Sequence, residues 1–457
     1  MAIEANSETL QEVLRWKACL LHQRMTSRRI IRERHSINKY VYFAASLAVF
    51  AYSVAESIGP QSVYPYSNVL DYRNSYNRNT NLLSIPESGI YYFSLSAGVP
   101  ANMAIDYSII IPNGNLRPAA LRTHTAGTGI DTISRDAILQ LNRGNVNVRS
   151  GGNLYSDAFK LTSLSAFSIS DTMSNPRYFY VYQPSGIFSN FGRIRFPTVL
   201  LNQPRDWDSN SDSYRCSQTG IYIFTFSVFV DPADIVRSQL NVGNKVYELL
   251  REHTNHGMNG GDVLSRTILT TCNAGDTVFA SLNGGVIQGR RELTTGLMGF
   301  AYTPNLSKSQ NVYWSLSRNT EVVNDGVGLA DYLFTRLDEA SFGLRIEQRS
   351  GNLYRAVVCP ASGWYYVHLT AVTMPNFRMN LFVSVNGQRQ MSLFRSSAWH
   401  NGGMDYMSRS GILRCRQGEQ MSVQIGGRQA VGRTSSSRAN MYGTTFLGFM
   451  LYSDNTV

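Results

Sequence analysis

The sequence is poor in charged residues and in histidine. Charged side chains make up 16% of the 457 residues, and histidine occurs seven times. The chain contains no Gly-x-Ser-x-Gly sequence, no P-loop and no His-Glu-x-x-His motif. The hydrolases, nucleotide-binding proteins and zinc proteases that depend on these motifs are therefore excluded. We expect a protein that is not an enzyme and has no resident cofactor.

Clustered positive charge is also scarce outside the N-terminus. The formal net charge is +11, but eight of the 42 basic residues lie before Tyr40 and the others are scattered, most of them arginines. A nucleic-acid-binding surface needs a basic stripe or a recognisable motif. We therefore expect no nucleic-acid partner.

Cysteine is rare, and its spacing is informative. Cys19 stands alone, whereas the separation between Cys216 and Cys272 is identical to that between Cys359 and Cys415. This equal spacing predicts one disulfide in each pair, and a disulfide implies an oxidising compartment. Four independent buried thiols are the alternative.

Metal and modification signals are few. His253 and His256 follow Glu252 in a predicted loop, where a solvated surface is a simpler interpretation than a metal site. Asn305 begins the only N-glycosylation sequon, between the second and third predicted domains.

One stretch occurs three times. It begins at Gly89 (Gly-Ile-Tyr-Tyr-Phe), Gly220 (Gly-Ile-Tyr-Ile-Phe) and Gly363 (Gly-Trp-Tyr-Tyr-Val). The intervals between these glycines are too long for a solenoid repeat and match the length of a complete domain. They therefore indicate that a whole domain is duplicated.

Each copy of this stretch is apolar on both faces of the predicted strand. A strand with one solvated face alternates apolar and polar residues, so a second cover is needed, and a neighbouring copy of the domain is the simplest one. The residues that we predict to pack between domains are aromatic: Tyr91, Phe93, Tyr222, Phe224, Phe300, Tyr365 and Phe449.

The N-terminal region predicts a membrane anchor. Residues 1–39 are basic, and Tyr40 to Ala55 is a run of sixteen residues without charge. We predict a cytoplasmic segment at 1–39, a transmembrane signal-anchor helix at 40–57 and a stalk at 58–67. A signal peptide cleaved after Ala55 and a buried soluble helix are the alternatives.

The remaining chain is expected to form three β-sandwiches, at residues 68–172, 177–304 and 311–453. Each contains short alternating strands separated by turns, such as the Asn386-Gly387 hairpin signal.

These landmarks together resemble the globular head of complement C1q and its relatives in the tumour necrosis factor superfamily. The resemblance is carried by Cys-Pro-Ala-Ser-Gly-Trp-Tyr-Tyr-Val at 359–367, Ala-Gly-Asp at 274–276 and Leu-Gly-Phe-Met-Leu at 447–451. It implies an all-β fold of three tandem jelly rolls that trimerise through the sheet of the glycine strand. Calcium, which some relatives bind, is implied only as a possibility, through carboxylates such as Asp231, Asp234 and Asp276.

Short linkers favour a single-chain pseudo-trimer. About six residues separate the first two domains, and six extended residues reach roughly 20 Å, enough to join neighbouring heads at a common base. A string of separate domains and trimers formed between chains are the alternatives, and higher oligomers are compatible with the prediction.

The predicted function is extracellular recognition in innate immunity, at the cell surface or after secretion. The expected partner is a glycan, microbial surface or protein receptor, bound through apical loops. The candidate ligand residues are Arg251, His253, His256, Arg290, Arg291, Arg395, Trp399 and His400. A structural or adhesive component of a matrix or coat is one alternative, and a type II membrane ligand of the necrosis-factor kind is another.

Overall fold

The computed structural model describes residues 47–454 apart from segments between its strands. The residues outside this description are 1–46, 53–67, 72–74, 78–79, 81, 101–102, 112–116, 123–129, 155, 157–160, 190, 231–234, 252–260, 305–310, 319–321, 325–328, 350, 352, 374–378, 396–404, 427–428, 432–442 and 455–457. The predicted basic segment, the predicted stalk, Cys19 and Asn305 all lie outside it.

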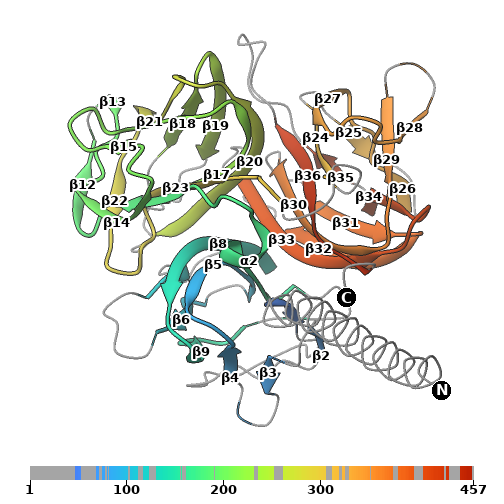
Figure 1. Cartoon of the computed structure of the whole chain (residues 1–457), viewed down its shortest axis with the longest axis horizontal. Coiled ribbons are helices and arrows are strands. Elements are labelled where there is room, and N and C mark those ends of the chain that lie inside the picture. The colour runs from blue at the N-terminus through green and yellow to red at the C-terminus, as the bar shows by residue number, and fades with distance from the viewer. Residues whose placement is uncertain are drawn as a thin grey trace, which may run out of the picture. The chain divides into compact units, whose positions relative to one another are not determined.

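The described residues are almost entirely β-strand and form three repeats (Figure 1). We define repeat 1 as residues 47–172, repeat 2 as 177–304 and repeat 3 as 311–454. In Figure 1 they are coloured blue to teal, green to yellow, and orange to red. The expected all-β jelly-roll fold is confirmed.

The strands of repeat 1 are followed by a single-turn helix, α2 (Ile169–Thr172), which Ser168 caps. The strands are β1 (Ala48–Tyr52), β2 (Asn68–Asp71), β3 (Tyr76–Asn77), β4 (Leu82–Ile85), β5 (Gly89–Pro100), β6 (Ile105–Ile110), β7 (Ala119–Arg122), β8 (Ile130–Leu141), β9 (Gly144–Ser150) and β10 (Ser163–Ser168).

Repeat 2 follows the same order. Its strands are β11 (Tyr178–Tyr182), β12 (Gly186–Phe188), β13 (Gly192–Arg193), β14 (Thr198–Gln203), β15 (Trp207–Asp208), β16 (Ser213–Arg215), β17 (Gly220–Val230), β18 (Val236–Val242), β19 (Lys245–Arg251), β20 (Asp262–Cys272), β21 (Thr277–Gly284), β22 (Ile287–Gly289) and β23 (Gly296–Ala301).

Repeat 3 completes the series. Its strands are β24 (Tyr313–Arg318), β25 (Val322–Asn324), β26 (Leu329–Asp331), β27 (Arg336–Ala340), β28 (Ile346–Arg349), β29 (Leu353–Val358), β30 (Gly363–Thr373), β31 (Met379–Val385), β32 (Gln388–Arg395), β33 (Asp405–Cys415), β34 (Gln420–Gly426), β35 (Gln429–Val431) and β36 (Thr444–Ser453).

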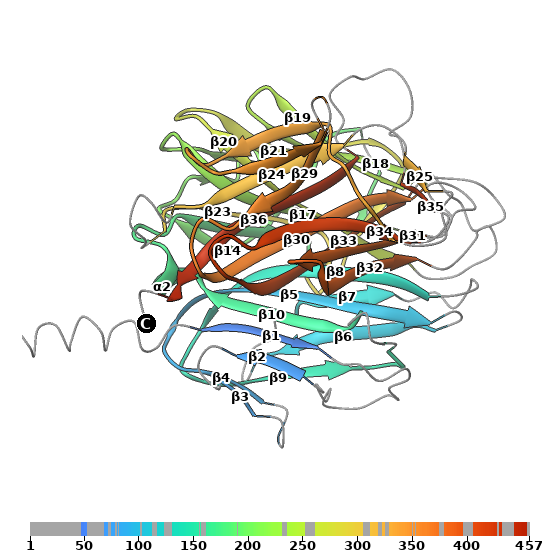
Figure 2. The ribbon, with the colours of Figure 1, turned by 90° about the vertical axis from the view of Figure 1, so that its right-hand side faces the viewer.

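Each repeat builds an inner sheet around its glycine strand. The strand orders are β2-β1-β10-β5-β8 in repeat 1, β14-β11-β23-β17-β20 in repeat 2 and β27-β24-β36-β30-β33 in repeat 3. In Figure 2 the glycine strands β5, β17 and β30 run in the same general direction. We call the end of these strands at Gly89, Gly220 and Gly363 the basal end, and the opposite end the apical end.

The outer sheet of each repeat joins the inner sheet of the next repeat at the apical end. Strand β7 pairs with β20, β19 pairs with β33, and β32 pairs with β8. The residues in register at these junctions are Arg122 with Asp262, Arg251 with Asp405, and Arg395 with Asp131. Repeat 1 therefore joins repeat 2, repeat 2 joins repeat 3, and repeat 3 joins repeat 1. Head-to-tail contacts that close in this way form a ring with quasi-threefold symmetry.

The glycine strands are covered on both faces. In β17 every residue from Tyr222 to Val230 is buried, because the outer sheet of repeat 2 packs on one face and the other repeats pack on the second. This is the double cover that the two-sided apolar pattern requires.

The prediction of a transmembrane helix at 40–57 is wrong for the part of this segment that forms β1. Ala48–Tyr52 is a strand that pairs with β10 on one side and β2 on the other, and Ala48 to Ala51 are fully buried. A central strand buried on both faces is as apolar as a membrane segment, which explains the misassignment. Residues 40–46 and 53–57 lie outside the described residues, and no helix within the described residues is long and apolar enough to cross a bilayer.

Both predicted disulfides are confirmed. Cys216 is bonded to Cys272 and Cys359 to Cys415, each with a Cα–Cα distance of 6.3 Å. In repeat 1 the corresponding positions are Ile85 and Leu141, which are 2% and 3% exposed and lie in the hydrophobic core. Packing in repeat 1 thus replaces the covalent bond of the other two repeats.

Candidate functional site

The three inner sheets meet in a cluster of equivalent aromatic rings. Phe167, Phe300 and Phe449 each pair in register with the fourth residue of a glycine strand: Tyr92, Ile223 and Tyr366, respectively. The Phe ring centroids are 6.1 Å, 6.0 Å and 6.1 Å apart in the three possible pairs. Three nearly equal separations are the geometry of a threefold arrangement. Contacts of this length add about 0.5–1.5 kcal/mol per pair beyond the burial of area.

Several residues predicted to pack between repeats face their own repeat instead. The hydroxyls of Tyr91, Tyr222 and Tyr365 donate to the carbonyl four residues upstream, at 2.6 Å, 3.0 Å and 2.7 Å. Tyr222 and Phe224 belong to the core of repeat 2, and Phe93 shares the face of Tyr91, because residues two apart lie on the same side of a strand. The boundary face begins one residue later in each copy. Both faces are apolar at this point, so periodicity did not distinguish them.

A buried polar layer lies above the aromatic cluster, toward the apical end. The glycine strands contribute Ser94, Thr225 and His368, and the partner strands contribute Asp136, Thr267 and Ser410 in register with them. The Thr267 hydroxyl of repeat 2 donates to Asp136 Oδ2 of repeat 1 at 2.7 Å. Such hydrogen bonds offset part of the cost of burying polar groups, whereas Ser94 Oγ and Asp136 Oδ1 are buried without a hydrogen-bond partner.

His368 is held as a neutral imidazole in this layer. It is 1% exposed, and its Nδ1 and Nε2 atoms lie 2.8 Å from Ser410 Oγ and 2.9 Å from Thr370 Oγ1. Burial lowers the pKa of His368 from 6.5 to about 4; the charge of Asp136 opposes this shift and that of Arg266 adds to it. His368 therefore carries no charge at neutral pH.

Three buried arginines connect the repeats in the same cyclic order. Arg135, Arg266 and Arg409 occupy equivalent positions and are at most 2% exposed. Arg135 donates to Tyr180 OH of repeat 2 at 2.7 Å, and also contacts Ser227 Oγ and the Leu293 carbonyl.

The other two arginines repeat this reach into the next repeat. Arg266 Nη1 lies 3.5 Å from Tyr406 OH of repeat 3, and Arg409 Nη2 donates to Ser163 Oγ of repeat 1 at 3.0 Å. The planar guanidinium, with five donors, suits a site where several oxygens must be satisfied at once.

The predicted ligand loops are only partly described. Arg251 and Arg395 end β19 and β32 and lie in register with Asp405 and Asp131, so their backbone belongs to the junctions between repeats and not to free loops. His253, His256, Trp399 and His400 lie outside the described residues.

The two remaining candidates lie at the apical end of repeat 2. The Arg290 guanidinium stacks over the Phe229 ring at 4.1 Å, and Arg291 is exposed. Arg290 therefore has a packing role of its own, whereas Arg291 is open to a partner.

A carboxylate closes the basal boundary between repeats 2 and 3. Glu339 of β27 accepts from Lys245 Nζ at 2.9 Å, from the Thr271 N–H at 2.8 Å and from the Thr271 hydroxyl at 2.8 Å. Burial favours the neutral acid, but these donors outweigh burial and lower the pKa of Glu339. We call this set of contacts the Glu339 clasp.

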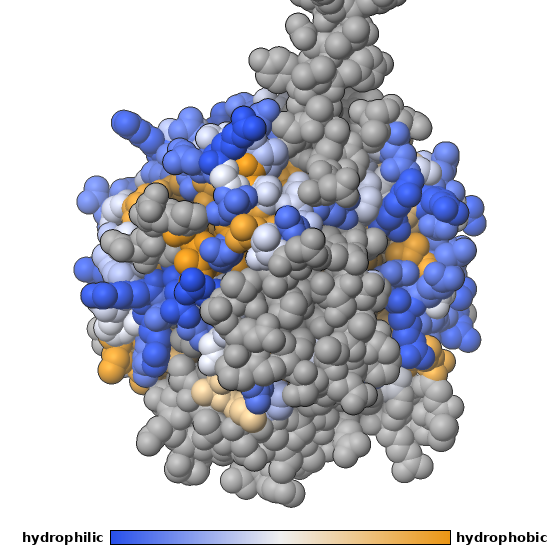
Figure 3. All heavy atoms as spheres, turned by 90° about the horizontal axis from the view of Figure 1, so that it is seen from below, coloured by the Kyte–Doolittle hydropathy of each residue, from blue (hydrophilic) through white to orange (hydrophobic). Residues whose placement is uncertain are grey.

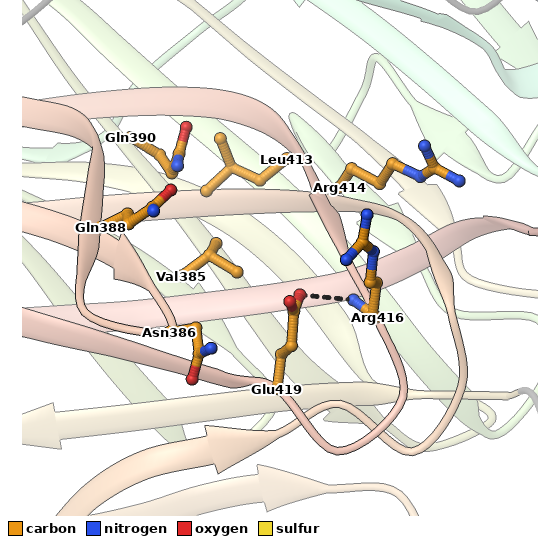
Figure 4. Close-up of a pocket in the computed structure, with 8 residues that line it drawn as sticks. All are labelled: Val385, Asn386, Gln388, Gln390, Leu413, Arg414, Arg416 and Glu419. Atoms are coloured by element: carbon orange, nitrogen blue, oxygen red, sulfur yellow. Dashed lines mark hydrogen bonds between the residues drawn. The ribbon is translucent and has the colours of Figure 1, made fainter.

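The basal end of repeat 3 carries a pocket of about 380 Å³. It lies between the turn that joins β31 to β32 and the end of β33 (Figure 4), and it is lined by Val385, Asn386, Gln388, Gln390, Leu413, Arg414, Arg416 and Glu419. Val385 and Leu413 are buried, while both arginines are exposed. The pocket thus combines an apolar floor with guanidinium and amide groups and with the Glu419 carboxylate, which accepts from the Arg416 N–H.

The described surface mixes polar and apolar residues. On the face in Figure 3, orange groups are interrupted by blue ones among the coloured residues, as on most protein surfaces. Within the part of the chain that the structure describes, no group of three or more His, Cys, Asp or Glu residues is placed to hold a metal. Asp276 accepts from Asn273 in its own turn, and Asp231 and Asp234 lie outside the described residues. The described residues do not fit a calcium site.

Comparison with known families identifies the middle of the chain. Residues 179–301 match the C1q domain. This C1q domain coincides with repeat 2, including its disulfide and its aromatic first strand. No curated protein matches the sequence.

Two solved structures are similar to part of the chain. The globular domain of zebrafish complement 1qA is 16% identical, with 28% of this chain and 99% of that chain covered and a TM-score of 0.22. Murine APRIL at pH 5.0 is 14% identical, with 28% and 98% covered and a TM-score of 0.23.

The three buried arginines and the basal pocket escaped the sequence analysis, although the arginines have a clear signal. A Ser-Arg pair precedes Leu141, Cys272 and Cys415 by the same distance: Arg135, Arg266 and Arg409 each lie six residues upstream. A basic residue recurring in an apolar strand at one position of three repeats indicates a shared internal role. The pocket has no comparable signal.

Proposed function

We propose that the chain is an extracellular recognition protein whose three repeats are C1q-type domains closed into a single-chain pseudo-trimer. The observation that carries the proposal is the ring of contacts between repeats, with the aromatic triangle at its centre. The C1q match to residues 179–301 supports the assignment of repeat 2, and the shared strand order extends it to repeats 1 and 3.

The proposed location is outside the cytosol. The two disulfides support it, because such bonds persist in oxidising compartments. We propose a glycan, microbial surface or protein receptor as the partner, and a binding role without catalysis. Function then depends on exposed side chains such as Arg291, Arg414 and Arg416.

A structural or adhesive role is the second candidate. Ile187 and Phe191 of repeat 2 are 71% and 77% exposed, and exposed apolar side chains favour self-association. The third alternative, a receptor-activating membrane ligand, depended on a type II anchor, and β1 occupies part of that segment.

Light scattering combined with glycan-array binding tests the proposal on the full chain. We expect a particle with the mass of one chain, 51.1 kDa, that binds a defined subset of glycans or surfaces. A concentration-dependent trimer of chains would contradict the single-chain ring. Assembly into insoluble polymers that bind no array ligand would favour the structural role.

A further inference from the structure

We propose that the basal pocket of repeat 3 binds the carboxylate of a hydroxylated acid, of the chemical class of a uronic acid residue. The inference rests on the recognition function proposed above and names a ligand class for one site. It follows from comparing this pocket with the equivalent position in repeat 2, where the chain itself supplies a carboxylate.

The two positions are related by the offset between the second cysteines of the two repeats. Cys272 corresponds to Cys415 and Thr271 to Arg414 on the strands β20 and β33, and Lys245 corresponds to Gln388 at the start of β19 and β32. The turns also match, because the Asn273 N–H donates to Asp276 and the Arg416 N–H donates to Glu419, at 2.9 Å and 2.8 Å. The pocket of repeat 3 is therefore the counterpart of the Glu339 clasp.

The backbone position that Glu339 occupies in repeat 3 is occupied by an apolar residue in the described part of repeat 1. Glu339 lies opposite Ser315, which pairs with Leu447, two residues before Phe449. In repeat 1 the residue two before Phe167 is Ser165, which pairs with Phe50 on β1. Phe50 pairs in turn with Leu70 on β2. Leu70 thus takes the backbone position of Glu339 at the boundary between repeats 3 and 1.

The residues around the pocket suit an external acid. Arg414 stands at the position of Thr271, whose hydroxyl donates to Glu339 in repeat 2, and Arg416 stands at the position of Asn273. Both bring guanidinium groups to the pocket, and guanidinium groups bind carboxylates with paired hydrogen bonds. Arg414 Nη2 is 2.9 Å from Asp454 Oδ2, which orients this side chain.

The rest of the lining is the reason for proposing an acid that carries hydroxyl groups. Asn386 and Gln388 present amides that both donate and accept hydrogen bonds, as hydroxyl groups require, and Val385 and Leu413 offer a small apolar floor. Figure 4 shows the amides and the arginines on opposite sides of the pocket. A ligand with a carboxylate at one end and hydroxyls at the other matches this division.

Titration of the full chain with glucuronate, followed by ligand-observed NMR, tests the inference. Glucose and the methyl ester of glucuronic acid lack the charged carboxylate, so their affinities show how much that group contributes. Acetate has the carboxylate but no hydroxyls, so its affinity shows how much the hydroxyls contribute. We expect glucuronate to bind at least tenfold more tightly than each of the three. The Arg416→Gln substitution should weaken glucuronate binding at least tenfold, whereas Arg349→Gln, at an exposed position of β28 outside the pocket, should leave it unchanged.

A second variant tests the comparison itself. Leu70→Glu introduces a carboxylate at the backbone position equivalent to Glu339 and should also lower the affinity for glucuronate. Equal binding of glucose, no binding of glucuronate, or binding that neither Arg416→Gln nor Leu70→Glu reduces would overturn the inference. If Arg416→Gln leaves every glycan-array signal intact, the pocket assignment fails while the recognition function stands.

Discussion

The hydroxyl oxygens of Tyr92 and Tyr366 lie 2.8 Å apart, although 274 residues separate them in the sequence. One belongs to repeat 1 and the other to repeat 3, and both are fully buried beside the aromatic triangle. The Tyr366 hydroxyl also lies 2.8 Å from Ser410 Oγ. The boundary between repeats therefore has the close packing and hydrogen bonding of a domain core, which leads to the following expectations.

Truncating the aromatic triangle should destabilise the whole chain. Phe300→Ala removes a ring that contacts Phe167 and Phe449, and we expect the free energy of unfolding to fall by about 3–5 kcal/mol. Chemical denaturation measures the change. Phe342→Ala is the matched control, because Phe342 is fully exposed and its loss should change stability by less than about 0.5 kcal/mol. Equal effects of the two substitutions would rule out a packed triangle.

Removing a buried arginine should weaken the contact between two repeats. Arg135→Ala leaves the Tyr180 hydroxyl and the Leu293 carbonyl of repeat 2 without this donor, and we expect a loss of about 3 kcal/mol in unfolding free energy. Limited proteolysis should also become faster. Arg149→Ala, at an exposed position of the same repeat, should have little effect on either measurement.

Stability should depend on pH through His368. Burial lowers the pKa of His368 to about 4 in the folded protein, so the unfolded chain, with a pKa of 6.5, binds the proton more strongly. Protonation of His368 in the unfolded chain therefore destabilises the folded state progressively as pH falls from about 6.5 to about 4, by up to about 3 kcal/mol.

The His368→Gln substitution removes the contribution of His368 to the pH dependence of stability. Denaturation of both proteins at pH 7 and pH 4 should show a smaller loss of stability for the variant. If the two proteins lose the same free energy between these pH values, His368 does not titrate as described.

Each disulfide should stabilise its repeat by closing a long loop. Replacing Cys216 and Cys272 with Ala should lower the unfolding free energy by about 4 kcal/mol in the chain-entropy model, since 56 residues separate them. Thermal unfolding monitors the effect, and non-reducing peptide mapping checks the pairing. A Cys216–Cys359 peptide would contradict the described connectivity.

Much of this fold follows from local patterns. Strand alternation, the Asn386-Gly387 turn and the equal spacing of the cysteine pairs predicted the β-sandwiches and both disulfides. The two apolar faces of the glycine strand also predicted that something covers it twice. They did not show which face meets a neighbour, because Tyr91 and Tyr92 are equally suited to burial.

The first strand of repeat 1 shows where an apolar run misleads. Val-Phe-Ala-Tyr at 49–52 was assigned to a membrane helix, but β1 precedes Gly89 by almost the same interval as β11 precedes Gly220. The spacing of the repeats therefore contained the correct assignment. The basal pocket had no such signal, because its lining comes from two separate segments, 385–390 and 413–419, that only the fold brings together.

Covalent tethering gives the ring of repeats a property that three separate subunits lack. Because peptide bonds hold every partner at high effective concentration, dilution does not dissociate the ring. The repeats are also free to diverge individually: among the described residues, the Asp136 carboxylate, the His368 imidazole and the basal pocket described above each belong to a single repeat. Such a particle is monovalent at that pocket, and tight attachment to a surface would require several chains to gather there.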